Sequence, residues 1–178
     1  SEGDIEKAID ILRKKGQKIA AKRGENDASE GLIFAQTTPD HKVGVVLALN
    51  CETDFVAKND SYRNFVQSLM DIAIAKLPAS AEELKGLKYD DRLTVDEKIT
   101  EQVGVIGEKL DLSGYAVLKG EAVVAYNHPG NQLATLVALN NGNEAAVEAG
   151  RQVAMQVAAM NPIALNKDGV DARTIERE

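Results

Sequence analysis

Apolar side chains near the start of the chain recur with the spacing of an α-helix. One stripe along residues 4–15 is formed by Ile5, Ala8, Ile9 and Leu12. Positions three and four apart share a helix face, so this spacing predicts a helix that Asp4 caps and Gly16 ends. One such helix cannot bury its own stripe, so it packs on the rest of the protein or has lost its partners. The basic residues around its end predict a linker, which is solvated or contacts a partner: Lys14, Lys15, Lys18, Lys22 and Arg23.

Two apolar runs with a short connection predict a pair of strands. Residues 31–38 and 43–50 are joined by T-P-D-H, in which the proline fixes φ and the aspartate bonds to nearby backbone. The second run is nearly continuous in Val and Leu, as in a buried strand. It leads into a predicted helix over residues 61–76, which ends before Pro78.

The rest of the chain continues this mixture of helices and strands. Residues 79–89 form a looser, charged segment, and T-V-D-E at 94–97 matches a capping box that opens a helix. Gly104 and Gly107 fall inside that helix, where a glycine either permits close packing or loosens the last turn. The later pattern predicts strands over 112–119, 121–126 and 133–139, then an Ala-rich helix over 144–160. In the polar tail, residues 171–178 could begin another helix.

One strand-to-helix unit occurs twice in the sequence. V-V-L-A-L-N at 45–50 is echoed by T-L-V-A-L-N at 135–140, and each is followed by a predicted helix that ends at a proline. From the last asparagine of its strand, the first copy runs 28 positions to Pro78, whereas the second runs 22 to Pro162. The first copy is therefore six residues longer, which is the length of T-D-F-V-A-K at 53–58.

This repeat predicts an α+β fold built from two related halves, each an antiparallel sheet packed with helices. The first half of the core would span residues 29–111, and the second would span 112–178. Within the first half, Thr53 is placed to cap a helix that begins at Asp54, whose negative charge suits the positive end of a helix.

The six extra residues carry the clearest candidate for a binding feature. The second copy indicates that a unit of this type closes without them, so the apolar pair Phe55 and Val56 is available to bind something else. The alternative is that both side chains fill a pocket of the core. These residues alone leave both interpretations open.

Charge and composition narrow the classes of function. The net charge of −7 argues against a general phosphate-binding surface for nucleic acid, which needs clustered Lys and Arg. No apolar run approaches the roughly 20 residues of a membrane span, and no signal peptide opens the sequence. The single cysteine cannot form an internal disulfide. We therefore expect a cytoplasmic location, with no direct nucleic-acid partner and no membrane.

Side chains able to carry catalysis are sparse. A catalytic cysteine needs a nearby base and a lowered pKa, and Cys51 has only His41 and His128, which are both predicted to lie in turns. Metal-ligand spacings and motifs for phosphate loops, zinc proteases and serine hydrolases are absent. Glu52 and Asp54 are close in sequence, but nothing places them across a substrate. We predict a protein that is not an enzyme and has no cofactor or metal; a cysteine enzyme is the disfavoured alternative.

The segment around the insert resembles a known family. N-C-E-T-D-F-V-A-K-N-D at residues 50–60 is similar to the T-D-F-V signature of elongation factor Ts, the bacterial exchange factor for elongation factor Tu. Weaker matches in the family's order lie at residues 3–9, 20–22, 106–108 and 126–128. The chain departs from the family at Pro129, where glycine is frequent, and has Arg23 in place of a lysine.

The resemblance also implies that the chain is a fragment. Residues 1–28 would be the remnant of a small N-terminal helical domain with its basic linker, whose first helices are missing. The second half of the core would be truncated at Glu178, near where the family usually carries a helical hairpin.

The function implied by the resemblance is guanine-nucleotide exchange on elongation factor Tu during translation elongation. The segment formed by Thr53, Asp54, Phe55 and Val56 would enter the partner near its magnesium and phosphate site. Phe55 would be the wedge, Asp54 its polar contact and Val56 its support, and the magnesium would be a ligand of the partner alone. The same contact face would include Arg23, Ile106, Gly107 and His128. The alternative is a non-catalytic interaction domain that docks a partner through Phe55 and Val56.

Overall fold

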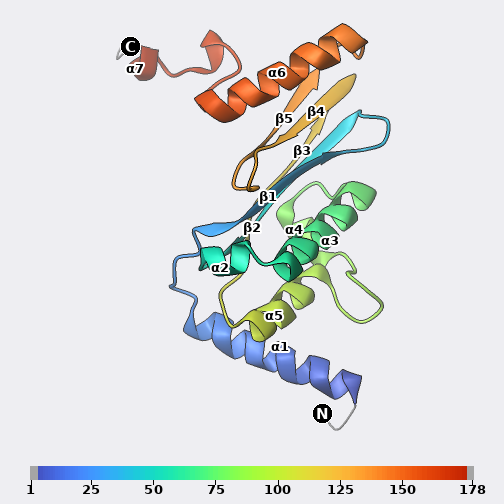
Figure 1. Ribbon diagram of the computed structural model, residues 1–178, viewed down its shortest axis with the longest axis vertical. Coiled ribbons are helices and arrows are strands. Elements are labelled where there is room, and N and C mark those ends of the chain that lie inside the picture. Colours follow the sequence, from blue (N-terminus) through green and yellow to red (C-terminus); the bar gives the residue numbers. More distant parts are fainter. Residues whose placement is uncertain (1–3, 176–178) are drawn as a thin grey trace.

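Two antiparallel sheets form the centre of the molecule, and helices pack around them (Figure 1). The computed structural model describes residues 4–175. The strands are β1 (Glu30–Thr37), β2 (Val43–Cys51), β3 (Asp111–Lys119), β4 (Ala122–Asn127) and β5 (Ala134–Leu139). The helices are α1 (Ile5–Lys22), α2 (Asp54–Ala57), α3 (Asp60–Lys76), α4 (Ala81–Gly86), α5 (Val95–Ile106), α6 (Glu144–Met160), the 3-10 turn η1 (Lys167–Gly169) and α7 (Ala172–Ile175). The predicted α+β class is confirmed.

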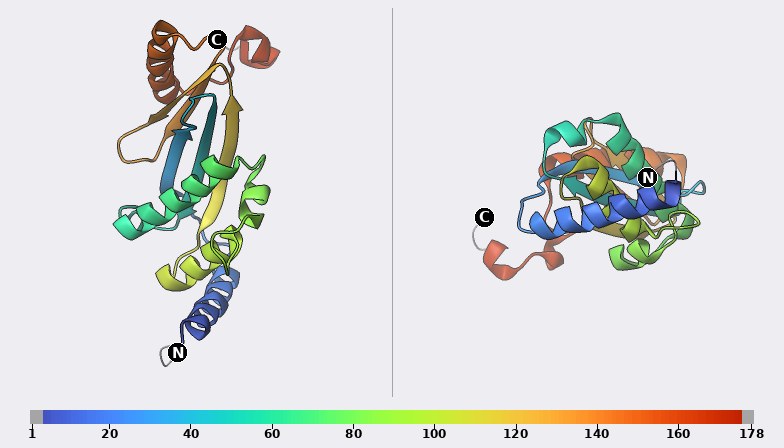
Figure 2. Two further views of the ribbon diagram at one scale, coloured as in Figure 1. Left: turned by 90° about the vertical axis from the view of Figure 1, so that its right-hand side faces the viewer. Right: turned by 90° about the horizontal axis from the view of Figure 1, so that it is seen from below.

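The molecule is elongated, with α1 at one end and α6 at the other (Figure 2). The first sheet has the order β1-β2-β3, and the second contains β4 and β5. The sheets therefore divide between β3 and β4, whereas the ranges 29–111 and 112–178 for the two halves stay a prediction. Residue 3 of the segment at 3–9 and the last three residues of the predicted tail helix at 171–178 lie outside the described residues.

The predicted repeat is confirmed from the hairpins onward. Both β2 and β5 lie in antiparallel sheets and lead into helices of 17 residues, α3 and α6. Each of these helices is capped by an asparagine at its start and ends at a left-handed residue before proline. The two N-caps, Asn59 and Asn143, follow the strand-ending asparagines by nine and three positions, so the difference is again six.

The hairpin turns are also equivalent, at positions 90 apart in the sequence. The Thr38 N–H donates to the Val43 carbonyl at 2.8 Å, and the His128 N–H donates to the Leu133 carbonyl at 2.9 Å. In each turn the residue three positions later is left-handed. Histidine and asparagine tolerate this conformation better than most residues other than glycine.

Each hairpin turn binds the edge strand of the other half. The Ile33 N–H on β1 donates to the Asn131 carbonyl at 2.6 Å, and the Val123 N–H on β4 donates to the His41 carbonyl at 2.6 Å. Residues 33 and 123 are equivalent, as are 41 and 131, so one bond is made in both directions. The contact between the two halves therefore has approximate twofold symmetry.

The main apolar core of the described residues fills the space between the first sheet and the helices α3 and α5. Leu47, Leu49, Leu69 and Met70 are fully buried in it, and the Tyr62 hydroxyl donates to the Leu49 carbonyl at 2.7 Å. Within residues 4–175, no helix is both long enough and apolar enough to cross a membrane.

The predicted end of the first helix at Gly16 is wrong. Helix α1 continues to Lys22, so most of the expected basic linker is helical, and Arg23 is its C-cap. Gly16 is buried because it lies at the crossing of α1 and α5, where a Cβ would collide with the Thr100 carbonyl. The glycine therefore permits contact between helices and does not stop the helix. The apolar stripe is only partly covered, since Ile5 remains 66% exposed.

The end of α5 also differs from the prediction. The helix stops at Ile106, and Gly107 is its left-handed C-cap with φ of 84°. Gly104 lies inside the helix opposite Gly16, where a Cβ would collide with the Leu12 carbonyl. The two glycines thus have the two roles that the sequence left open, close packing for Gly104 and the end of the helix for Gly107. The looser segment at 79–89 contains the short helix α4, which the sequence analysis missed.

We expect Gly16→Ala to loosen α1 while leaving the core folded. The added methyl group would push α1 away from α5, an overpacking cost of about 1–3 kcal/mol. Hydrogen exchange should show α1 less protected than β2 in the native chain, and less protected still in the variant. Gly86→Ala is the control, because no atom from another part of the described chain lies within 4 Å of a Cβ at that position. Protection of α1 equal to that of β2 in the native chain would contradict this description.

Candidate functional site

The six-residue insert is one turn of helix with its own caps. Thr53 precedes α2 and its hydroxyl accepts from the Val56 N–H at 3.5 Å, while the Lys58 N–H donates to the Asp54 carbonyl at 2.9 Å. A lone turn has little stability of its own, so it must be held by its surroundings.

The side chains of α2 divide into an anchored set and an exposed one. Ala57 is buried in the core, and Val56 is half-buried and packs against the same core. Phe55 is 83% exposed. The interpretation that both apolar side chains fill a core pocket is therefore wrong for Phe55, and Val56 supports the turn that presents it.

A carboxylate from the far end of the first half fixes the start of α2. Glu108 accepts hydrogen bonds from the Glu52 N–H and the Thr53 N–H, each at 3.1 Å, and from the Thr53 hydroxyl at 2.7 Å. Glu108 directly follows Gly107, the residue that ends α5. The left-handed turn at Gly107 thus lets α5 end where its next residue can hold the N-cap of α2.

A second carboxylate joins this loop to the end of α1. Glu52 accepts from Arg23 Nη1 at 2.6 Å, from Asn26 Nδ2 at 2.8 Å and from the Lys109 N–H at 2.6 Å. Lys109 Nζ in turn donates to the Gly24 carbonyl at 2.8 Å. Burial opposes ionisation of Glu52, but the hydrogen bonds from Lys109, Asn26 and Arg23 together hold its pKa below the ordinary value.

Asp54 is partly exposed at the start of α2 and is paired along the helix. Its carboxylate accepts from Lys58 Nζ at 2.6 Å. This hydrogen bond holds the pKa of the Asp54 carboxyl below its ordinary value, so the group is ionised at neutral pH. An ionised carboxylate and an exposed phenyl ring therefore come from consecutive residues of this turn.

The structure brings most of the predicted contact residues to one edge of the molecule. The ends of α1 and α5, helix α2 and the second hairpin turn all lie on the left in Figure 1. Ile106 is half-buried against the core, and Gly107 is half-buried beside it. Arg23 joins this group through Glu52.

His128 belongs to a separate hydrogen-bonded group at the same edge. Its Nδ1 lies 3.0 Å from the Tyr126 hydroxyl, and its side chain is exposed in the second hairpin turn. That turn is held on the first half through Asn131, which binds Ile33 by its carbonyl and accepts from Arg63 Nη1 at 2.8 Å. The position of His128 therefore depends on the contact between the halves.

The residues that position α2 were not recognised from the sequence. In the sequence, Glu52 stands out only as a neighbour of Asp54, and Glu108 only as part of the weak match at residues 106–108. The available signal was a carboxylate directly before the Thr53 cap and another directly after a helix-ending glycine. The residues that these two carboxylates bind lie 26 to 57 positions away in the sequence, which spacing rules cannot detect.

Chemistry other than binding has little support at this site. Cys51 is buried beneath the loop, its Sγ lies 3.3 Å from the Thr53 carbonyl, and burial raises the pKa of the thiol. A thiol kept protonated in this way is a poor nucleophile. Within residues 4–175, no group of three or more His, Cys, Asp or Glu side chains is arranged to hold a metal ion.

Comparison with known proteins identifies the family. The family model described as Elongation factor TS matches residues 52–178. The chain is 52% identical to "Elongation factor Ts" of Amoebophilus asiaticus and 49% identical to that of Cytophaga hutchinsonii, over the whole of this chain and 64% of each relative. It is 45% identical to the protein of that name from Bacteroides thetaiotaomicron, of which it spans 53%. The T-D-F-V resemblance is thus confirmed over the full length, and the chain belongs to the elongation factor Ts family.

Proposed function

We propose that this chain promotes guanine-nucleotide exchange on elongation factor Tu during translation elongation. The observation that carries the proposal is Phe55, an aromatic side chain left 83% exposed on a turn that the buried Ala57 and the half-buried Val56 anchor to the core. Membership of the elongation factor Ts family and the names of the relatives support it. The chain spans 64% of those relatives, so the proposal concerns what this part contributes.

In the proposed mechanism the protein performs no covalent chemistry. Phe55 enters the nucleotide-binding domain of the partner as a wedge, and Asp54 makes the polar contact beside it. Both disturb the region that holds the partner's magnesium and phosphates. A protein that binds the nucleotide-free partner more tightly must weaken nucleotide binding by the same factor, because the two equilibria are linked.

The fixed position of α2 favours such a wedge. Ordering a flexible loop upon binding costs free energy, and a segment that is already ordered avoids most of that cost. Here Glu108 holds the N-cap, Glu52 directly before it is bonded to Arg23 at the end of α1, and Ala57 is buried in the core. We propose that these contacts keep the Phe55 ring in place before the partner arrives.

The remaining contact residues are proposed to extend the same interface. Ile106 and Gly107 would lie beside α2, and His128 would contribute from the second hairpin turn. Arg23 donates to Glu52 in the free protein, so we propose that it acts mainly by holding the end of α1 near the wedge.

We expect Phe55→Ala to abolish most of the exchange activity and to leave the fold nearly intact. Truncating a buried phenylalanine costs about 3–5 kcal/mol of stability, whereas an exposed change stays within about 0.5 kcal/mol. An aromatic anchor buried in an interface is worth about 2 kcal/mol or more of binding. The two measurements are the denaturant midpoint and the rate of labelled GDP release from elongation factor Tu.

Leu165→Ala is the matched control for this experiment, because Leu165 is also an exposed apolar side chain. It should change neither the midpoint nor GDP release. If Phe55→Ala lowered the midpoint strongly while each folded molecule kept native exchange activity, Phe55 would be a core residue and the proposal would fail.

Asp54→Ala should reduce exchange in the same direction but by a smaller factor than Phe55→Ala. The carboxylate is exposed and paired with Lys58, so its removal deletes one polar contact with the partner. Lys58→Ala separates the two roles of the pair, since it breaks the helical ion pair but keeps the carboxylate. GDP release slowed by Asp54→Ala and by Lys58→Ala to the same extent would show that the pair acts only within the helix.

We expect Glu52→Gln to destabilise the loop in a pH-dependent way. The folded-state pKa of Glu52 lies below its ordinary value of 4.5, so its stabilising effect is fully present above that value. The effect is lost as the pH falls through the folded-state pKa. Denaturant midpoints should therefore differ most between the variant and the native chain at neutral pH, and converge in acid. Glu25→Gln, an exposed change in the neighbouring loop, should show no such convergence; a constant difference for Glu52→Gln would contradict its assigned role.

A further inference from the structure

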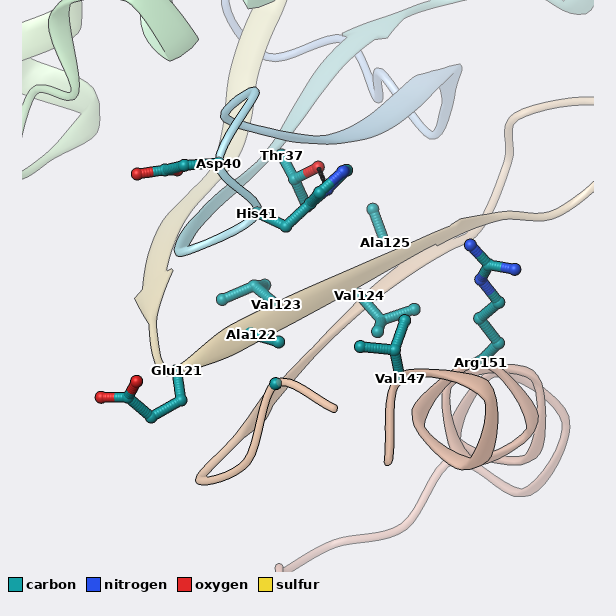
Figure 3. A pocket seen from close by; sticks show the side chains of 11 residues that line it. Thr37, Asp40, His41, Glu121, Ala122, Val123, Val124, Ala125, Val147 and Arg151 are labelled. Carbon is teal, nitrogen blue, oxygen red and sulfur yellow. Dashed lines mark hydrogen bonds between the residues drawn. The ribbon is translucent and has the colours of Figure 1, made fainter. Parts of the chain in front are cut away.

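A cavity of about 290 Å³ lies at the turn of the first hairpin, which is the end of the hairpin away from α2. It is enclosed by this turn, β4 and the first turns of α6 (Figure 3). Its floor is apolar, because Val123 and Val124 are buried and Val147 points toward Val124 from α6. Polar groups stand at its rim, with Asp40 and Glu121 on one side in Figure 3 and Arg151 on the other. The exchange mechanism proposed for α2 makes no use of this cavity.

The repeat shows what occupies the equivalent space in the first half. There the guanidinium of Arg63, on α3, lies 5.7 Å from the centroid of the Phe34 ring on β1. Its Nη1 also donates to Asn131 Oδ1, in the turn of the other half, at 2.8 Å. An arginine side chain of the protein itself thus fills the space between strand, helix and turn.

In the second half the three equivalent positions hold shorter or different side chains. Val124 stands 90 positions after Phe34, and His41 stands 90 positions before Asn131. Beyond the six-residue insert the offset is 84, which places Val147 at the position of Arg63. Both valines end well short of the space that the ring and the guanidinium occupy in the first half. The cavity is therefore the unfilled counterpart of the Arg63 site.

The strand edge beside the cavity is open as well. In the first half, the outward N–H and C=O of Ala35 are bound by the side-chain amide of Asn127 at 2.8 and 2.9 Å. The equivalent of Ala35 is Ala125, which lies two residues after Val123 and so faces the same side of β4. Thr37 replaces Asn127 there, and its hydroxyl lies 3.0 Å from His41 Nδ1. Hydrogen bonds among residues 4–175 leave the outward backbone of Ala125 unpaired.

The rim of the cavity carries two carboxylates and one guanidinium. The Thr38 hydroxyl and the Lys42 N–H donate to Asp40, which holds the pKa of this carboxyl below its ordinary value. Glu121 is a second exposed carboxylate. The cation at the opposite side, Arg151, is 3.5 Å from Glu148 on its own helix.

We propose that this cavity binds an arginine side chain presented by an extended segment of a partner protein. The alkyl part would cover the valines, and the guanidinium would take the place that Arg63 fills in the first half. The Thr37 hydroxyl and the rim carboxylates are acceptors for its planar set of donors, which lysine lacks. The partner's backbone would pair with the open N–H and C=O of Ala125, as a strand added to a sheet edge.

The probe is the tripeptide N-acetyl-Ala-Arg-Ala-amide, titrated into the 178-residue chain and followed by NMR. The Ala125 amide and the Val147 methyl groups should shift and saturate. The same peptide with citrulline in place of arginine keeps the shape but loses the charge. It should bind about fivefold more weakly or worse, the difference between charged and neutral hydrogen bonds. Equal affinity of the two peptides, or shifts that never saturate, would overturn the proposal.

Three variants locate the binding. Val147→Arg restores the residue of the first half, so the protein should fill its own cavity and the shifts on titration should disappear. Asp40→Asn changes an exposed group without threatening the fold and should weaken binding about two- to fivefold, the range of one exposed ion pair. Arg151→Gln removes the opposing cation and should leave the affinity unchanged or higher. Native affinity in both Val147→Arg and Asp40→Asn would place the peptide elsewhere and refute the assignment.

Discussion

Two backbone hydrogen bonds join the halves reciprocally and determine how the two hairpins meet. Each hairpin turn offers a carbonyl, from His41 or Asn131, to the edge strand of the other half. Both turn residues are left-handed, so the turn geometry and the contact between halves are determined together. If either turn changed shape, the edge strand that it covers would lose its partner. The second turn, which carries His128, is held in place by the same bond.

Much of the fold could be predicted because the sequence contains an internal repeat, so that one copy can be compared with the other. The echo of V-V-L-A-L-N in T-L-V-A-L-N gave the two strands, the two helices and the length of the insert. The Ala-rich helix predicted over residues 144–160 agrees with α6 at both ends. The exposure of Phe55 was predictable in the same way, because the second copy shows that the unit closes without it. The family signature added the expected role but not the geometry.

The parts that could not be predicted depend on contacts between distant positions. From the sequence alone, Gly16 is expected to end the helix. Its position inside α1 is explained only by the close crossing with α5. Glu52 and Glu108 likewise resemble ordinary surface carboxylates until their partners are brought to them. Helix α4 was missed because its six residues are too few for the apolar spacing to repeat.

The location of the insert has a consequence for how such a protein can change. The extra turn enters between the end of a strand and the N-cap of the next helix, and both copies keep a 17-residue helix after it. The extra turn does not alter which residues of the helix face the sheet, so the core packs in the same way with or without it. A duplicated unit can therefore acquire a recognition element in one copy while the other preserves the architecture. The junction at residues 141–142 is the corresponding place where a designed turn could be added to the second half.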